Sequence, residues 1–193
     1  MLPSTIRQKI LQQRKNLDSD FQNHASLLVM EKLGNMKEFQ KAQNIALYLA
    51  INGELNTLPI IKKSWKLKKN CYLPICNCED KTLSFSHYQQ HDELIRNKYG
   101  IYEPNDNANN HIDIETLDLV ITPLVAFDPR GNRLGMGCGF YDKTFALKKN
   151  HKKQKPYLLG VAYEFQKIQK ITANTWDIPL DCVITEKEVY LFN

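Results

Sequence analysis

Apolar residues recur at helical spacing in two segments near the start of the chain. The spacing in residues 4–17 predicts an amphipathic helix with Ile10 on its apolar face and with Arg7 and Arg14 on its other, basic sides. Residues 19–33 repeat the helical spacing, and polar residues on either side supply a cap and a stop. The start of the chain is therefore predicted to form two consecutive helices.

Short apolar runs, typical of buried strands, follow along the rest of the chain. They cover residues 44–50, 71–76, 83–88, 117–122, 157–163 and 182–192. Pro123 has no N–H to donate to a central ladder, so the fourth of these strands is expected to end there. Helices are predicted at residues 57–69 and 141–149, and a surface loop at residues 103–111. The alternation of strands and helices predicts an α/β layered fold.

Composition narrows the class of protein. The 193 residues are 42% hydrophobic and 24% charged, which is typical of a globular chain and predicts one domain spanning residues 1–193. The longest apolar run is too short for a membrane span, and the first residues lack a secretory hydrophobic segment, so we expect a cytoplasmic protein. Five cysteines, an odd number, do not suggest a disulfide framework. The net charge of +5 suits an anionic small molecule as well as nucleic acid.

Residues 127–142 are the most informative stretch because four glycines fall within nine residues. These glycines are Gly131, Gly135, Gly137 and Gly139. Glycine lets the backbone approach a ligand closely and turn its N–H groups toward one point, and the positive end of the following helix favours phosphate. Arg130, Arg133 and Lys143 add full positive charges. The alternative is a mobile surface loop with glycine at its turns.

The run from Gly131 to Asp142 closely resembles the signature of the 5-formyltetrahydrofolate cyclo-ligase family, also called methenyltetrahydrofolate synthetase. Further matches to the family follow in order along most of the chain, at Ile6-Arg7 with Arg14 and at residues 48–57, 100–104, 122–128 and 176–181. The resemblance implies a three-layer, Rossmann-like sheet flanked by helices, related to sugar-phosphate isomerases and CoA transferases. It also implies a ligase that converts 5-formyltetrahydrofolate to 5,10-methenyltetrahydrofolate, with ATP cleaved to ADP and phosphate and Mg²⁺ required.

The resemblance also assigns roles to individual residues. It implies that Arg133 and Tyr141 are catalytic and that Asp142 and Asp177 bind Mg²⁺. The residues it implies for ATP are Arg7, Arg133, Leu134, Gly135, Met136, Gly137, Cys138, Gly139, Phe140 and Tyr141. The residues it implies for the folate are Leu49, Glu54, Tyr102, Met136, Gly137, Cys138, Gly139 and Phe140.

Taken without the family, several of these residues have plainer interpretations. Asp142 and Asp177 are equally typical of helix caps, Glu54 of an exposed turn, and Tyr102 of half-buried packing. The chain also departs from the family at Pro3, where a lysine is usual. Either Lys9 or a nearby basic residue takes the place of that lysine, or this side of the site makes fewer contacts with the nucleotide. Cys138 is a second departure, because glycine or lysine is usual there.

Two other classes of function are open to the sequence. Three cysteines and two histidines suggest a zinc site: Cys71, Cys76, Cys78, His87 and His91. However, a single residue separates Cys76 from Cys78, whereas the cysteine pairs of zinc sites are usually separated by two or more residues. Paired lysines suggest nucleic-acid binding, but such pairs are usually solvated helix faces. We expect a monomer that binds ATP and a folate, whose glutamate tail is often several residues long, and neither nucleic acid nor membrane.

Overall fold

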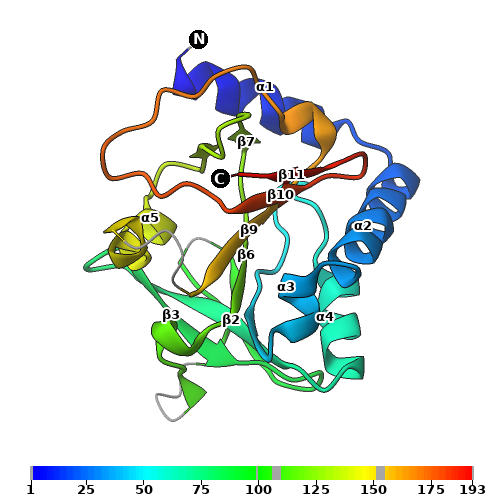
Figure 1. Ribbon diagram of the computed structural model, residues 1–193, viewed down its shortest axis with the longest axis vertical. Helices are drawn as coiled ribbons and strands as arrows, with labels where there is room; N and C mark the ends of the chain where they lie inside the picture. Colours follow the sequence, from blue (N-terminus) through cyan, green and yellow to red (C-terminus); the bar gives the residue numbers. More distant parts are fainter. Residues whose placement is uncertain (1, 99, 106–109, 151–154, 193) are drawn as a thin grey trace.

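The computed structural model describes residues 2–98, 100–105, 110–150 and 155–192 (Figure 1). The α-helices are α1 (Pro3–Lys15), α2 (Ser19–Gly34), α3 (Lys37–Lys41), α4 (Leu58–Lys66) and α5 (Phe140–Thr144). Short 3-10 helices are η2 (Ile114–Thr116), η3 (Ala146–Asn150) and η4 (Glu164–Gln166). Among the described residues, none of the helices combines the length and apolarity needed to cross a bilayer.

The strands form one large sheet and two short ribbons. The large sheet contains β1 (Asn44–Ala46), β2 (Asn70–Asn77), β3 (Thr82–His87), β6 (Leu119–Thr122), β9 (Tyr157–Val161), β10 (Cys182–Ile184) and β11 (Val189–Leu191). Two-stranded ribbons join β4 (Leu94–Arg96) to β5 (Tyr102–Pro104) and β7 (Ala126–Phe127) to β8 (Arg133–Leu134).

The seven-stranded sheet has the order β11-β10-β9-β6-β1-β2-β3 and is mostly parallel. β1 lies between two parallel neighbours, with Ile45 opposite Cys71 of β2 and Leu119 of β6. Only the edge strands β3 and β11 pair antiparallel within this sheet. The prediction of an α/β fold with a Rossmann-like sheet between helices is confirmed.

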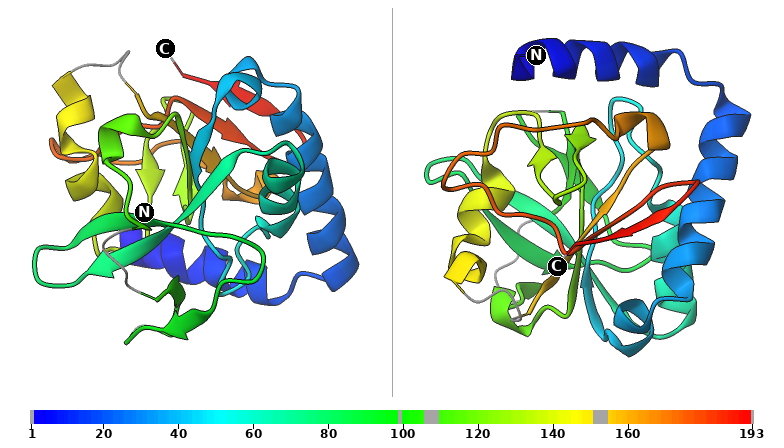
Figure 2. Two further views of the ribbon diagram at one scale, coloured as in Figure 1. Left: turned by 90° about the horizontal axis from the view of Figure 1, so that it is seen from below. Right: turned by 45° about the horizontal axis from the view of Figure 1, so that its top comes forward.

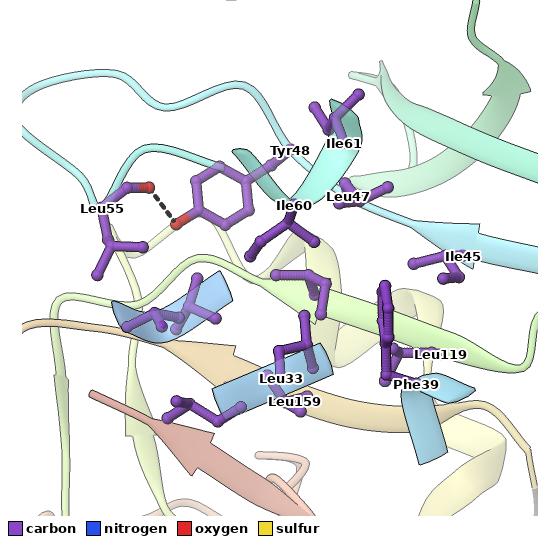
Figure 3. Packing of buried hydrophobic residues seen from close by; sticks show 14 of the residues in the cluster. Leu33, Phe39, Ile45, Leu47, Tyr48, Leu55, Ile60, Ile61, Leu119 and Leu159 are labelled. Carbon is purple, nitrogen blue, oxygen red and sulfur yellow. Dashed lines mark hydrogen bonds between the residues drawn. The ribbon is translucent and has the colours of Figure 1, made fainter. Parts of the chain in front are cut away.

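Apolar side chains cover both faces of the sheet, as a parallel sheet requires. On one face, α2, α3 and α4 pack together over the strands, and buried residues such as Leu33, Phe39 and Ile60 meet Ile45 and Leu159 (Figures 1 and 3). On the other face, α5 and the segments around it contribute a second buried cluster. The result is a helix–sheet–helix arrangement of three layers.

Helix α1 lies outside these layers and crosses the end of the sheet (Figure 2). Ile10 is buried, and Ile6 packs against a small cluster that includes Leu134 and Ile171. The apolar face was predicted, but the assignment of Arg14 to the solvated sides is wrong. Arg14 is buried with 2% of its surface exposed, because its guanidinium points into the body of the protein and donates to the Leu124 carbonyl oxygen.

Several element boundaries differ from the prediction for local reasons. β1 ends at Ala46 rather than residue 50, after which the Leu47 N–H bonds to Tyr72 and the chain leaves the sheet. The helix predicted at residues 141–149 is five residues long, and the 3-10 helix η3 replaces its second half. The predicted loop at residues 103–111 begins within strand β5, and residues 106–109 lie outside the described residues.

The connections around β1 and β6 leave a crevice at their carboxyl ends. From β1 the chain proceeds through α4 to β2 on one side, whereas β6 leads through β7, β8 and α5 to β9 on the other side. The loops that follow β1 and β6 therefore diverge to opposite faces of the sheet. In open α/β sheets, ligands bind at this kind of topological switch point.

A substitution at Gly160 in β9 tests how closely the segment after β6 packs against the sheet. A Cβ at this position would lie 2.5 Å from Leu124 Cδ2 and 2.8 Å from Leu180 Cδ1. We expect Gly160→Ala to lower the free energy of unfolding by about 1–3 kcal/mol in urea titrations, because buried side chains must shift. Gly135→Ala is the control, since nothing lies within 4 Å of its added Cβ. Equal stability of Gly160→Ala and the wild type would contradict this packing.

Candidate active site

A cavity of about 1280 Å³ opens at the carboxyl ends of β1 and β6. Every residue to which the family resemblance assigns a role in catalysis, ATP, folate or metal binding lines this cavity, although the residues come from the start, middle and end of the chain. Single-ligand pockets usually measure about 300–1000 Å³, so the cavity is large enough for two substrates. The structure thus brings together all the residues to which the resemblance assigns a role.

The glycine-rich loop forms one wall of the cavity. It begins at the β7–β8 ribbon, where the Val125 N–H donates to the Leu134 carbonyl at 2.7 Å. Gly137 and Gly139 have φ values of 112° and 75°, in the left-handed region that favours glycine. A Cβ on Gly137 would also lie 3.5 Å from an Arg7 guanidinium nitrogen. The positive φ values are the reason that the sequence needs glycine at both positions.

Arg7 reaches this loop from helix α1. Its Nε donates to the Gly135 carbonyl at 2.7 Å, and its side chain is half-buried against the cavity. The guanidinium therefore keeps terminal N–H groups beside the backbone of Gly137. Lys9, considered above as a substitute for the family's usual lysine, is exposed and does not line this cavity.

Asp128 fixes the turn that enters the loop. Its buried carboxylate accepts hydrogen bonds from the backbone of Arg130 and Asn132 and from the Ile171 N–H at 3.0 Å. Burial opposes ionisation, but hydrogen bonds from the Asn132 side chain, from the Ile171 N–H and from Arg130 prevail and lower the pKa of Asp128. Arg130 pairs with this carboxylate at 3.2 Å and does not line the cavity, so its prediction as a phosphate-binding cation is wrong.

Arg133 and Asp142 form a buried ion pair at the base of the loop. Arg133 Nη2 donates to Asp142 Oδ1 at 2.7 Å, and Arg133 Nη1 donates to the Ile178 carbonyl. The Ile178 N–H donates to the same Asp142 oxygen at 3.0 Å. Burial lowers the pKa of Arg133, and Asp142 opposes this effect. The pair holds the loop and the C-terminal segment in fixed relation.

Asp177 brings a second carboxylate to the same wall. Its Oδ2 accepts a hydrogen bond from the Asn174 N–H at 2.8 Å, which closes a turn, and Asp177 lies near enough to Arg133 to raise the pKa of that guanidinium. Within the described residues, no cluster of three or more His, Cys, Asp or Glu side chains is placed to hold a metal ion. A cation between these two carboxylates would take its remaining ligands from phosphate and water.

Glu54 lines the same cavity from the turn that follows β1. Its side chain is 10% exposed, so it is not the exposed turn acid that its sequence context allows. Oε2 accepts a hydrogen bond from the Ile51 N–H at 3.1 Å, and Oε1 lies 4.0 Å from Arg14 Nη1. Burial raises the pKa of Glu54 above its ordinary value, although the Ile51 N–H and the Arg14 guanidinium oppose this effect.

Two tyrosines stand beside Glu54: Tyr48, which is buried, and Tyr141, which is half-buried. Tyr48 donates to the Leu55 carbonyl at 3.1 Å (Figure 3). Burial, reinforced by the Glu54 charge, raises the pKa of Tyr48 and of Tyr141 well above the ordinary value. Both phenols therefore remain protonated at neutral pH and act as hydrogen-bond donors, not as bases.

Exposed side chains surround the mouth. Met136, Cys138 and Tyr102 are exposed, and Tyr102 lies under the Arg96 guanidinium. Trp176, next to Asp177, is 67% exposed and also lines the cavity.

Sequence reasoning gave no site role to Arg14, Trp176, Lys81 or Lys170. Trp176 lies inside one of the matched segments, so its type and position were a usable signal. Lys81 and Lys170 line the cavity from segments without any motif, and only the fold brings them there.

The site therefore combines a phosphate-suited backbone loop with cations and two carboxylates at one end. A buried carboxylate with neutral phenols stands at the other end. Such a site suits the transfer of a phosphoryl group to a polar heterocycle, because positioning and charge neutralisation are the main requirements of that reaction.

Comparisons with known proteins point to the same chemistry. The family model described as "5-formyltetrahydrofolate cyclo-ligase family" matches residues 3–186. The chain is 39% identical to the 5-formyltetrahydrofolate cyclo-ligase of Haemophilus influenzae, covering 91% of this chain and 92% of that protein. It is 35% identical to the Escherichia coli enzyme of the same name, covering 94% and 98%. The solved structure of Aquifex aeolicus 5,10-methenyltetrahydrofolate synthetase superimposes with a TM-score of 0.82 at 34% identity, covering 99% of this chain and 93% of that one.

Proposed function

The chain belongs to the 5-formyltetrahydrofolate cyclo-ligase family, and from this premise we propose that its cavity closes 5-formyltetrahydrofolate to 5,10-methenyltetrahydrofolate at the expense of ATP. The observation that carries the proposal is the convergence, on one cavity large enough for both substrates, of all the residues to which the resemblance assigns a role.

The reaction needs ATP because the oxygen of a formyl amide is a poor leaving group. Transfer of the terminal phosphoryl group of ATP to that oxygen gives an iminium phosphate and ADP. The neighbouring N10 amine then attacks the iminium carbon and the ring closes. N10 loses its proton, and phosphate leaves with the former formyl oxygen. The protein supplies positioning and charge stabilisation, so the site requires no protein nucleophile.

The glycine loop and Arg7 are suited to hold the phosphates. The loop turns its backbone toward the cavity, and Arg7 adds charge beside Gly137. Arg133 is already paired with Asp142, so we assign it the role of fixing this carboxylate and of placing positive charge behind the transferred phosphoryl group. The neutral Tyr141 phenol supplies an O–H donor for the formyl or phosphate oxygen.

Mg²⁺ fits the donor set of this wall. Asp142 and Asp177 each use one carboxylate oxygen in the hydrogen bonds described above, and the other oxygen of each makes no hydrogen bond to the described residues. One or two carboxylates, completed by phosphate oxygens and water, are the usual Mg²⁺ ligands. Bound there with ATP, the ion would neutralise negative charge on the phosphates.

The other end of the cavity suits the reduced pterin. The Glu54 carboxylate can accept hydrogen bonds from the pterin amino group and a ring N–H. Leu49 lines the cavity after β1 and offers apolar contact, and Tyr102 offers an aromatic face at the mouth. This assignment leaves the formyl group between the pterin end and the phosphate end.

The proposed activity is tested by mixing the protein with Mg·ATP and 5-formyltetrahydrofolate and recording near-ultraviolet absorbance. We expect the methenyl chromophore to appear with one ADP formed per product, and not to appear when ATP is omitted. Folate-independent ATP hydrolysis without the chromophore would contradict the proposed reaction.

Arg7 provides a test of the phosphate end. Arg7→Met removes one charged donor beside the loop, so we expect the KM for ATP to rise about tenfold while the KM for the folate stays near the wild-type value. Lys9→Met is the matched control, because it removes a charge from the same helix outside the cavity. Equal ATP KM values for the two variants would exclude the role assigned to Arg7.

Asp177 provides a test of the metal site. Asp177→Asn keeps an oxygen for the Asn174 N–H but removes a charge, so the Mg²⁺ concentration for half-maximal rate should rise by roughly tenfold or more. Asp92→Asn is the control, since Asp92 accepts from the Gln89 N–H in a four-residue turn of the same kind, which lies outside the cavity. An unchanged Mg²⁺ titration for Asp177→Asn would remove this residue from the metal site.

A further inference from the structure

Arg14 has an unusual environment for a residue of a peripheral helix. Its side chain is 2% exposed, and one nitrogen, Nη2, donates to the Leu124 carbonyl. Its Nε and Nη1 atoms are buried and have no hydrogen-bond partner among the described residues. A buried guanidinium with so few hydrogen bonds is costly unless a negative charge lies near it.

Glu54 supplies that charge. The pair is 4.0 Å apart, with side-chain exposures of 2% for Arg14 and 10% for Glu54. The turn that carries Glu54 also rests directly on Arg14, because a Cβ on Gly53 would lie 2.9 Å from Arg14 Cβ. Gly53 has a φ of 70°, so the turn needs glycine for its backbone shape as well.

The other titratable groups beside the pair are neutral phenols. Tyr48 and Tyr141 face Glu54, and Tyr163 faces Arg14. Burial raises the pKa of Tyr163 to about 12, and it raises the pKa of the other two tyrosines well above the ordinary value. Between pH 6 and pH 9 these phenols keep their protons, so Arg14 is the cation at 4.0 Å that balances Glu54.

Recognition of a pterin requires Glu54 in its ionised form. A carboxylate accepts hydrogen bonds through both oxygens, whereas a protonated carboxyl has one O–H that opposes a donor on the ligand. Burial alone favours the protonated form of Glu54.

Resting on the function proposed above, we propose that Arg14 is the positioning residue for the folate: its charge keeps Glu54 ionised and its side chain fixes the turn that presents Glu54 to the pterin. Arg14 also links the two ends of the cavity. Arg7, on the phosphate side, precedes it by seven residues on α1, which is about 10 Å along a helix. One helix therefore contacts both the glycine loop and the pterin end.

The test measures binding without catalysis. The affinity of 5-formyltetrahydrofolate, in the absence of ATP, is determined by calorimetry from pH 5.5 to pH 9 for the wild type, Arg14→Gln and Arg14→Lys. Gln removes the charge but keeps a donor for the Leu124 carbonyl, whereas Lys keeps the charge. Lys15→Gln is the control, because it removes an exposed charge one residue away.

The expected result follows from the sign of the effect on Glu54. The Arg14 charge lowers the pKa of Glu54, so its removal raises this pKa, and the carboxylate becomes protonated at a higher pH. As the pH falls, Arg14→Gln should therefore lose affinity about one pH unit earlier than the wild type, so its Kd should exceed the wild-type Kd by a factor that grows toward about tenfold at the acid end of the range. Arg14→Lys and Lys15→Gln should follow the wild-type profile. The folate itself titrates identically in the experiments with all four proteins. Differences between their pH profiles therefore come from the protein.

The outcomes separate this inference from the proposed function. A wild type that does not bind the folate at any pH overturns the proposed function itself. A wild type that binds, with an Arg14→Gln profile of the same shape and position, overturns only the role of Arg14. A purely structural Arg14 would change the unfolding midpoint and leave the pH profile in place.

A second measurement covers the case in which Arg14→Gln does not fold. The ¹³C resonance of the Glu54 carboxyl, assigned in the wild type by comparison with Glu54→Gln, reports its ionisation directly. The inference requires an ionised Glu54 at pH 7, and a protonated Glu54 at that pH would overturn it.

Discussion

The whole site depends on the divergence of the chain at the carboxyl ends of β1 and β6. These strands are parallel neighbours, yet the segments that follow them run to opposite faces of the sheet. The resulting crevice is a consequence of connectivity, and it exists before any side chain is considered. The turn after β1 supplies Glu54, and the ribbon after β6 leads into the glycine loop. The two chemically different ends of the cavity therefore come from the two sides of one topological switch.

Helix α1 joins these two ends although it belongs to neither helical layer. Arg7 bonds to the glycine loop, and Arg14 bonds to Leu124 and faces Glu54. The Leu124 carbonyl also accepts from the buried amide of Gln166, so the segment after β6 is held from both sides. Movement of α1 would change the phosphate end and the folate end together. This coupling suits a reaction in which both substrates must be aligned before the phosphoryl group moves.

The sequence predicted the layers of this fold well because buried strands and amphipathic helices leave strong local patterns. The glycine loop was recognisable for a related reason, since close backbone approach admits few other residues. Arg14 was misassigned because helical periodicity treats every arginine as solvated, and its burial depends on Glu54, which is forty residues away in the sequence. Arg130 was misassigned because its charge alone does not show in which direction its side chain points. In the structure the Arg130 side chain pairs with Asp128. A distant partner decided the first case, and a neighbour two residues away decided the second.

The central claim is that ATP and the folate occupy one cavity, with the phosphates at the glycine loop and the pterin at Glu54. The most direct measurement is a crystal structure of the protein with 5-formyltetrahydrofolate and a non-hydrolysable ATP analogue. The account predicts phosphate oxygens within hydrogen-bond distance of the backbone N–H groups of residues 135–139, and pterin nitrogens within that distance of the Glu54 carboxylate. A nucleotide bound elsewhere on the surface, or a pterin turned away from Glu54, would contradict it.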